Sequence, residues 1–257
     1  MTKAANSQSL PNLEAIGEPW PLSWAETYNV TPGKQADSCP ICHGKKTVAS
    51  ETVVNGIVYR QSRSCSCAAK DRNVALASRS GLNALFAKYG FDNYREDEPW
   101  QREAVMKARG YLANKDKGWF VMAGKPGSGK THLCVAVCKT LLEQGEPVLY
   151  APWREFAPRL KRAVNDKEYE KIIWPYKNKR HLFLDDLFKG TITESDANIA
   201  YELLNGRYNA MLPTIISTEK TLPELLEIDE AIGSRIAEMC KGYYVQTRGD
   251  NYRLKRG

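Results

Sequence analysis

The sequence predicts an α/β fold in which a central parallel sheet is flanked by helices, preceded by a small cysteine-rich domain. Three observations support this fold class. Apolar runs at 119–123, 181–187 and 214–219 alternate with helical patterns, and such runs are typical of strands buried on both faces of a parallel sheet. A glycine-rich loop joins the first run to a helix, and two close cysteine pairs lie upstream of it.

The loop at 124–131 reads Gly-Lys-Pro-Gly-Ser-Gly-Lys-Thr, a complete phosphate-binding loop. Its glycines let backbone N–H groups turn toward a phosphate, and the helix that follows adds its positive dipole end. Lys130 is expected against the β- and γ-phosphates, and Thr131 on Mg²⁺. The alternative is a chance glycine-rich turn, against which the flanking strand and helix argue. The predicted nucleotide contacts are Gly124, Lys125, Pro126, Gly127, Ser128, Gly129, Lys130, Thr131 and His132.

Two carboxylates end the second apolar run, His-Leu-Phe-Leu-Asp-Asp-Leu at 181–187. The carboxyl ends of parallel strands face the ligand crevice of an open sheet. We expect Asp185 to hold Mg²⁺ through water and Asp186 to polarise the attacking water as general base. The alternative is that Asp186 only caps the next helix.

Two further catalytic candidates come from later elements. A polar residue at the end of the strand 214–219 suits sensing of the γ-phosphate; Thr218 is the candidate, with Ser217 and Glu219 kept open. Arg235 lies far from the loop in sequence, which suits an arginine finger that serves a neighbouring subunit. A surface ion pair is the alternative for this arginine.

Four cysteines form two close pairs, Cys39 with Cys42 and Cys65 with Cys67. An Asn-Gly turn signal at 55–56 predicts a hairpin that brings the pairs together, as in a zinc ribbon. A closed four-thiolate zinc site would be structural rather than catalytic. Free thiols are the alternative, and a neighbouring histidine, His43, is a possible substitute ligand. The remaining cysteines, Cys134, Cys138 and Cys240, are expected to be small core residues.

The domain boundary is predicted near residue 90, which gives an N-terminal zinc-binding domain over 1–90 and a nucleotide-binding domain over 91–257. Residues 68–89 read as helical up to Gly90, and 91–99 as a polar linker.

Composition and charge bound the function classes. The chain has 257 residues, 42% of them hydrophobic and 26% charged, with a mean hydropathy of −0.50. No stretch approaches the roughly 18 apolar residues of a membrane span, and the N-terminal residues lack the core of a secretory signal. A cytoplasmic protein with no membrane partner is expected. The net charge of +7, clustered at 45–63, 154–180 and 241–256, suits a polyanionic partner or simply a solvated basic face.

Taken together, the motifs resemble bacterial and phage helicase loaders of the DnaC and DnaI type, and the related IstB transposition ATPases. The resemblance covers roughly residues 91–245. It rests on the phosphate loop with His132-Leu133, the Leu-Asp-Asp ending at 184–186, Asn-Gly-Arg-Tyr at 205–208, Pro-Thr-Ile-Ile-Ser at 213–217 and Gly-Ser-Arg at 233–235.

The resemblance implies an AAA+ P-loop ATPase without a separate lid, which hydrolyses Mg²⁺-ATP to ADP and phosphate. It also implies a homo-oligomer in the ATP state, with Arg235 as the finger on the adjacent subunit and Arg207 near the subunit interface. The implied partners are single-stranded DNA and a hexameric replicative helicase, which the N-terminal zinc domain would contact. ATP would switch such a loader between helicase-bound and released states.

The basic segment 154–180 carries interleaved aromatics, which suits stacking on single-stranded bases, although these aromatics could equally pack the helical insert. Three other functions compete with the loader. One is an IstB-like helper of DNA transposition on double-stranded DNA. The others are a small-molecule P-loop kinase and a nucleotide-gated helicase-binding module with little turnover.

Overall fold

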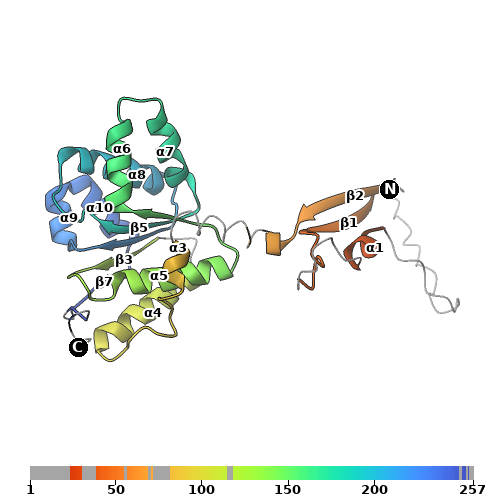
Figure 1. Cartoon of the computed structure of the whole chain (residues 1–257), viewed down its shortest axis with the longest axis horizontal. Helices are drawn as coiled ribbons and strands as arrows, with labels where there is room; N and C mark the ends of the chain where they lie inside the picture. Colours follow the sequence, from red (N-terminus) through yellow and green to blue (C-terminus); the bar gives the residue numbers. More distant parts are fainter. Residues whose placement is uncertain are drawn as a thin grey trace, which may run out of the picture. The chain divides into compact units, whose positions relative to one another are not determined.

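The computed structural model describes residues 24–30, 39–54, 57–68, 71, 82–114, 118–248, 251–252 and 254. The chain divides into two compact units, Met1–Cys65 and Ser66–Gly257 (Figure 1). Among the described residues, no helix has both the length and the apolar character that a bilayer crossing requires.

The described residues of the first unit form a two-stranded antiparallel hairpin with one helix beside it. Its elements are α1 (Trp24–Val30), β1 (Thr47–Val54) and β2 (Ile57–Ser64). Val54 pairs with Ile57, as the Asn-Gly signal predicts, although residues 55–56 themselves lie outside the described residues. The side chain of Asn29 fixes the helix to β1, because it accepts from the N–H of Ala49 at 2.9 Å and donates to its carbonyl at 3.0 Å.

The second unit contains a five-stranded sheet in the order β4-β5-β6-β3-β7, with every neighbouring pair parallel. The predicted fold class is therefore confirmed. The strands are β3 (Trp119–Ala123), β4 (Val148–Pro152), β5 (His181–Leu187), β6 (Thr214–Thr218) and β7 (Tyr244–Gln246).

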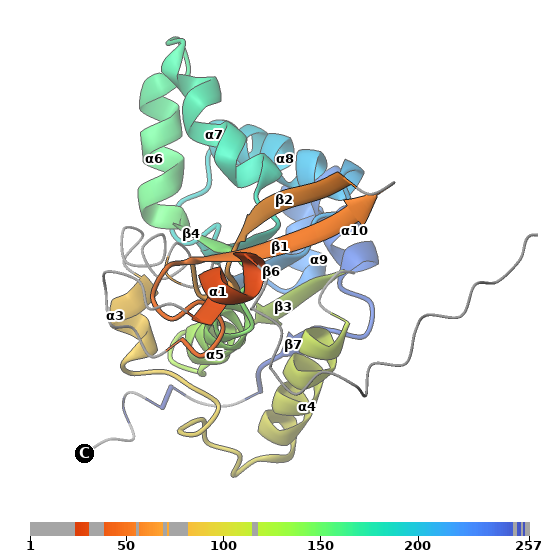
Figure 2. The same cartoon turned by 90° about the vertical axis from the view of Figure 1, so that its right-hand side faces the viewer.

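Helices cover both faces of this sheet (Figures 1 and 2). One face carries α3 (Leu82–Phe86), α4 (Pro99–Ala113) and α5 (Lys130–Glu143), and the other carries α8 (Glu194–Asn209), α9 (Leu222–Ile228) and α10 (Glu230–Met239). Two further helices, α6 (Trp153–Ala163) and α7 (Glu168–Asn178), lie side by side and project beyond the sheet (Figure 2).

The core has two halves, one on each face of the sheet. Along β3, Trp119 and Val121 join the cluster under α8 and α10, whereas Phe120 and Met122 join the cluster under α4 and α5. Successive side chains of a strand point to opposite faces, and here both faces are covered. This double burial explains the unbroken apolar runs of the sequence, and each large side chain so buried contributes about 1.5–3 kcal/mol.

The strand order brings the chemically important strand ends together. β3 lies between β6 and β7, so the chain that leaves β3 passes β6 and β5 to reach β4 at one edge, and the chain that leaves β6 later passes β3 to reach β7 at the other edge. Ala123 pairs with Thr218, which in turn pairs with Leu187. The carboxyl ends of β3, β5 and β6 therefore meet at one edge, where open parallel sheets bind ligands.

Residues 82–89, the end of the segment predicted to be helical, belong to the same compact unit as the sheet. Leu82 is fully buried in the core beside α5, and Leu85, Phe86 and Tyr89 pack against the same cluster. The structure thus groups residues 82–89 with the nucleotide-binding unit, upstream of the boundary predicted near residue 90. The rest of the helix predicted over 68–89 lies mainly outside the described residues.

Candidate nucleotide-binding site

The loop between β3 and α5 has the backbone that a phosphate cradle requires. Gly124, Gly127 and Gly129 have φ values of 131°, 73° and 90°, a region that favours glycine. Space is limited as well, because a Cβ on Gly124 would lie 2.2 Å from Oγ1 of Thr247. Both restrictions keep side chains away from the loop backbone at the start of α5.

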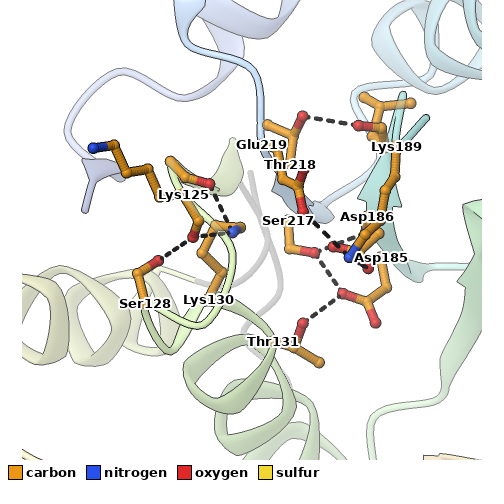
Figure 3. Close-up of polar contacts among 12 residues, drawn as sticks. Lys125, Ser128, Lys130, Thr131, Asp185, Asp186, Lys189, Ser217, Thr218 and Glu219 are labelled. Atoms are coloured by element: carbon orange, nitrogen blue, oxygen red, sulfur yellow. Dashed lines mark hydrogen bonds and ion pairs between the residues drawn. The ribbon is translucent and has the colours of Figure 1, made fainter. Parts of the chain in front are cut away.

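Lys130 is folded back into this loop. Its Nζ donates to the carbonyls of Gly124 at 2.7 Å and Lys125 at 2.8 Å, and the side chain is only 5% exposed (Figure 3). Burial lowers the pKa of Lys130, while the nearby charges of Glu219 and Asp186 oppose that shift. The ammonium is therefore held at the loop by two carbonyls that a phosphate would replace.

The carboxylate of Asp185 accepts hydrogen bonds from three hydroxyl groups. Thr131 donates to Oδ1 at 3.1 Å, Ser217 also donates to Oδ1, and Tyr150 donates to Oδ2 at 3.0 Å. Burial raises the pKa of Asp185, and these hydrogen bonds act in the opposite direction. The hydroxyl of Thr131 and the carboxylate of Asp185 are hard oxygen ligands in contact, which fits the predicted Mg²⁺ position. No local pattern points to Tyr150, which lies in the middle of β4.

Asp186 follows in a strained conformation. Its φ is 56°, beside an irregularity in the β5–β6 pairing between Leu184 and Leu187. Its N–H donates to Oγ of Ser217 at 2.8 Å, and its carboxylate accepts from Lys189 at 2.7 Å (Figure 3). The helix-cap alternative for Asp186 is wrong, because the cap of α8 is Thr193.

The end of β6 differs from the sensor prediction. Thr218 is fully buried, and its hydroxyl donates to the carbonyl of Leu187 at 2.8 Å, so it ties β6 to β5. The next residue, Glu219, lines the pocket, and Ser217 contacts both aspartates. The two alternative candidates for the sensor, Ser217 and Glu219, therefore face the site, whereas Thr218 does not line the described pocket.

A pocket extends from the loop across the segment just upstream of α4, which composition predicts to be a linker. Nε2 of His132 lies within donating distance of two acceptors, Gly90 O at 3.0 Å and Asn93 Oδ1 at 2.9 Å, and its ring packs against Tyr89 and Tyr94. The aromatic and amide cluster Phe-Asp-Asn-Tyr at 91–94 was the available signal. The pocket is lined by Tyr89, Asn93, Tyr94, Arg95, Gln101, Pro126, Gly127, Ser128, Gly129, Lys130, Thr131, His132, Asp186, Lys189, Glu219 and Tyr252.

Arg235 is not among the residues that line this pocket in the described chain. On α10, its Nη1 donates to the carbonyl of Ala231 at 2.7 Å, and its guanidinium lies 5.3 Å and 5.4 Å from the ring centroids of Tyr201 and Tyr208. The structure thus holds Arg235 against two aromatic rings of α8, apart from its own phosphate loop.

Arg207 has a structural position within its own chain, and the interpretation that places it near a subunit interface stays a prediction. Its side chain is fully buried, and burial lowers its pKa to about 9. It donates to Thr214 Oγ1 and to four carbonyls, at distances of 2.6–3.1 Å. These acceptors lie at the end of α7 and the start of β5 and β6, which the guanidinium holds together. The carbonyls belong to Tyr176, Lys179, Arg180 and Pro213.

The four cysteines predicted as metal ligands do lie together. The sulfurs of Cys39, Cys42, Cys65 and Cys67 are all within 4.8 Å of one another, and that of Cys39 is 3.9 Å from that of Cys65. Thiolates about 2.3 Å from a tetrahedral zinc ion would be roughly 3.8 Å apart. The group could therefore hold zinc, and among the described residues it does not include His43. The other cysteines, Cys134, Cys138 and Cys240, are buried, as expected.

The fold and this pocket define a P-loop nucleotide-binding protein of the AAA+ type. Residues 46–257 match the model of the IstB-like ATP-binding protein family, and the chain belongs to that family.

Relatives include two proteins of Bacillus subtilis (strain 168), each 34% identical. The uncharacterized protein YqaM matches over 75% of this chain and 66% of its own length, and the phage-like element PBSX protein XkdC over 74% and 76%. The replicative helicase loader DnaC of Escherichia coli (strain K12) is 27% identical over 69% of this chain and 74% of its own. The resemblance to this group is confirmed.

Solved structures agree on the fold. A crystal structure of the DnaC helicase loader has a TM-score of 0.55 at 24% identity, over 62% of this chain and 96% of its own. A crystal structure of DnaI has a TM-score of 0.52 at 21% identity, over 64% and 90%. These likenesses concern the fold alone.

Proposed function

We propose that this protein is an ATP-dependent loader of a hexameric replicative helicase onto single-stranded DNA. The proposal rests on the match to a replicative helicase loader, and this chain's own set of site residues supports it: Lys130, Thr131, Asp185 and Asp186. A protein that only binds nucleotide would not need both aspartates at the same strand end.

The ATPase step follows from the positions of the site residues. Thr131 and Asp185 would hold Mg²⁺, which when bound neutralises charge on the phosphates. Asp186 lies at the open end of β5, where it would accept a proton from the attacking water. Lys130 would exchange its two carbonyl partners for phosphate oxygens. Hydrolysis to ADP and phosphate is thus assigned to residues that already converge on one edge of the sheet.

Arg235 would complete the site of the next subunit in a homo-oligomer. Its guanidinium lies on α10, and in its own chain it contacts Ala231 and the rings of Tyr201 and Tyr208. A guanidinium held by aromatic faces and a single carbonyl has further N–H donors that it can offer to an incoming phosphate. This arrangement would make ATP turnover depend on assembly.

The helical pair α6–α7 would contact single-stranded DNA. Arg154, Arg159 and Arg162 are exposed on α6, and Trp174 is 63% exposed on α7. Phe156 and Tyr176 instead pack against each other at 4.5 Å, so they belong to the helical insert itself. Exposed cations beside one exposed indole suit backbone pairing and base stacking without sequence preference.

The test is copurification with the replicative hexameric helicase of the same cell, in ATP and in ADP. We expect a complex with this helicase that depends on residues 39–67 and changes with the nucleotide. The second candidate is a transposition helper, which the family model favours by its name. The absence of a helicase complex in either nucleotide, together with ATPase activity stimulated by double-stranded DNA, would support that helper.

A further inference from the structure

Lys189 joins two carboxylates at the ends of neighbouring strands. Its Nζ lies 2.7 Å from Oδ2 of Asp186, the last residue but one of β5, and 3.2 Å from Oε1 of Glu219, the residue after β6 (Figure 3). The lysine follows β5 by two residues, in the loop that leads to α8. Neither the phosphate loop nor the aspartate pair accounts for a second lysine here.

This ammonium shares the nucleotide pocket with Lys130. Both lysines line the pocket together with Thr131, Asp186 and Glu219. They are also near enough for the charge of Lys189 to lower the pKa of Lys130. Two cations at such a distance repel each other unless anions lie between them, and the carboxylates of Asp186 and Glu219 now have that role. A triphosphate brings further negative charge to the same place.

The pairs made by Lys189 are easily exchanged. Its side chain is 29% exposed, and those of Asp186 and Glu219 are 28% and 27% exposed, so water screens each pair. The side chain is a flexible four-carbon stem with three rotatable donors. Phosphate oxygens are charge-assisted acceptors as carboxylates are, so an incoming triphosphate can compete with Asp186 and Glu219 for this ammonium.

We propose that Lys189 is a ligand of the terminal phosphate of the bound nucleotide, held by Asp186 and Glu219 until a triphosphate enters. The inference rests on the nucleotide site of the proposed function. It gives Lys189 two effects. It adds a contact that a diphosphate lacks, so it discriminates ATP from ADP. Its departure also leaves the carboxylate of Asp186 free to face water, so the base is released only when there is a phosphate to attack.

The experiment measures binding rather than turnover. Isothermal titration with Mg²⁺ compares ADP with a non-hydrolysable ATP analogue for the wild-type protein, Lys189→Gln and Lys189→Arg. For Lys189→Gln we expect the analogue to bind about tenfold more weakly, as for a lost charge-assisted hydrogen bond, and ADP to change by less than about twofold. Lys189→Arg should recover part of the loss because it keeps the charge.

Lys241→Gln is the matched control, because Lys241 is exposed beyond α10. This variant should bind both nucleotides as the wild-type protein does. An equal loss for ADP and analogue, or no loss for either, would overturn the role of Lys189. Thermal unfolding of each variant identifies one that fails to fold, and Lys189→Arg then provides the test. Absence of nucleotide binding by the wild-type protein would instead count against the proposed function itself.

Discussion

The hydroxyl of Thr131 lies 3.1 Å from Oδ1 of Asp185, although 54 residues separate them in the chain. The contact joins the first turn of α5 to the end of β5, and it depends on β6 lying between β3 and β5 in the sheet. Asp185 is 7% exposed and meets Ser217 and Tyr150 as well. A carboxylate so buried is suited to a cation and is costly without one.

Replacing Asp185 should therefore separate stability from function. When both proteins lack nucleotide and Mg²⁺, we expect Asp185→Asn to unfold at a higher temperature than the wild-type protein. The gain in the free energy of unfolding should be about 1 kcal/mol at most, because the buried charge is removed and the hydrogen-bonding shape is kept. The same variant should lose the stabilisation that Mg²⁺-ATP gives to the wild type. Thermal unfolding with and without Mg²⁺-ATP measures both effects.

The pH dependence gives a control with a defined sign. Since burial raises the pKa of Asp185, the folded state binds more protons than the unfolded state between the ordinary and the raised value. The contribution of this residue to the stability of the free protein should thus fall as the pH rises through that interval. Asp185→Asn should lack this component. An identical pH profile for both proteins would contradict the assignment.

Arg207 gives a prediction about folding alone. Its guanidinium satisfies four carbonyls and one hydroxyl in a fully buried site, so truncation leaves buried acceptors without donors. We expect Arg207→Ala to lower the free energy of unfolding by about 3–5 kcal/mol, measured by urea denaturation. The exposed Arg154→Ala should change it by less than about 0.5 kcal/mol. Equal, small effects would mean that water replaces the guanidinium.

The cysteine cluster gives a prediction about metal and partner. Cys39→Ser should lower the zinc content measured by atomic emission from about one ion per chain, because three thiolates bind zinc far less well than four. Helicase copurification should be lost with the metal, whereas nucleotide affinity should stay within about twofold if the two domains fold independently. Cys240→Ser, at a buried cysteine outside the cluster, should keep the zinc. Joint loss of metal and nucleotide binding would show that the domains depend on each other.

Residues carried by contiguous motifs were predictable from the sequence. The phosphate loop, the two aspartates and the cysteine pairs can each be recognised from a few neighbouring residues. Thr218 shows the limit of such prediction, because successive side chains of a strand point to opposite faces. The hydroxyl of Thr218 donates to the carbonyl of Leu187, whereas the next residue, Glu219, lines the pocket.

Contacts set by topology could not be predicted in this way. Tyr150 reaches Asp185 only because β4 pairs with β5 in a register that no local pattern encodes. Arg207 lies in a motif typical of the family, yet its burial depends on four carbonyls from segments up to 31 residues away. Tyr89 and Tyr94 enter the pocket because the chain before α4 folds back over α5, where composition indicated only a polar linker.

The role proposed for Arg235 can be tested by mixing two inactive variants. Asp186→Asn should reduce ATP turnover at least about 100-fold, because its amide cannot accept the proton of the attacking water. Arg235→Ala should reduce it by about 10³-fold or more, as for other arginine fingers. Both should bind a non-hydrolysable ATP analogue with affinities close to that of the wild-type protein, since neither residue holds the ground-state phosphates in its own chain.

In a mixed oligomer, an intact Asp186 from one variant can meet an intact Arg235 from the other. We therefore expect turnover to reappear when the two proteins are combined, to rise with total concentration, and to peak near equal amounts. A double variant carrying both substitutions is the control, and it should restore nothing when added to either single variant. If the equimolar mixture stays as inactive as its components while analytical ultracentrifugation shows mixed oligomers, Arg235 does not act across the interface. Its contacts with Tyr201 and Tyr208 would then be its whole role, that of a link between α8 and α10.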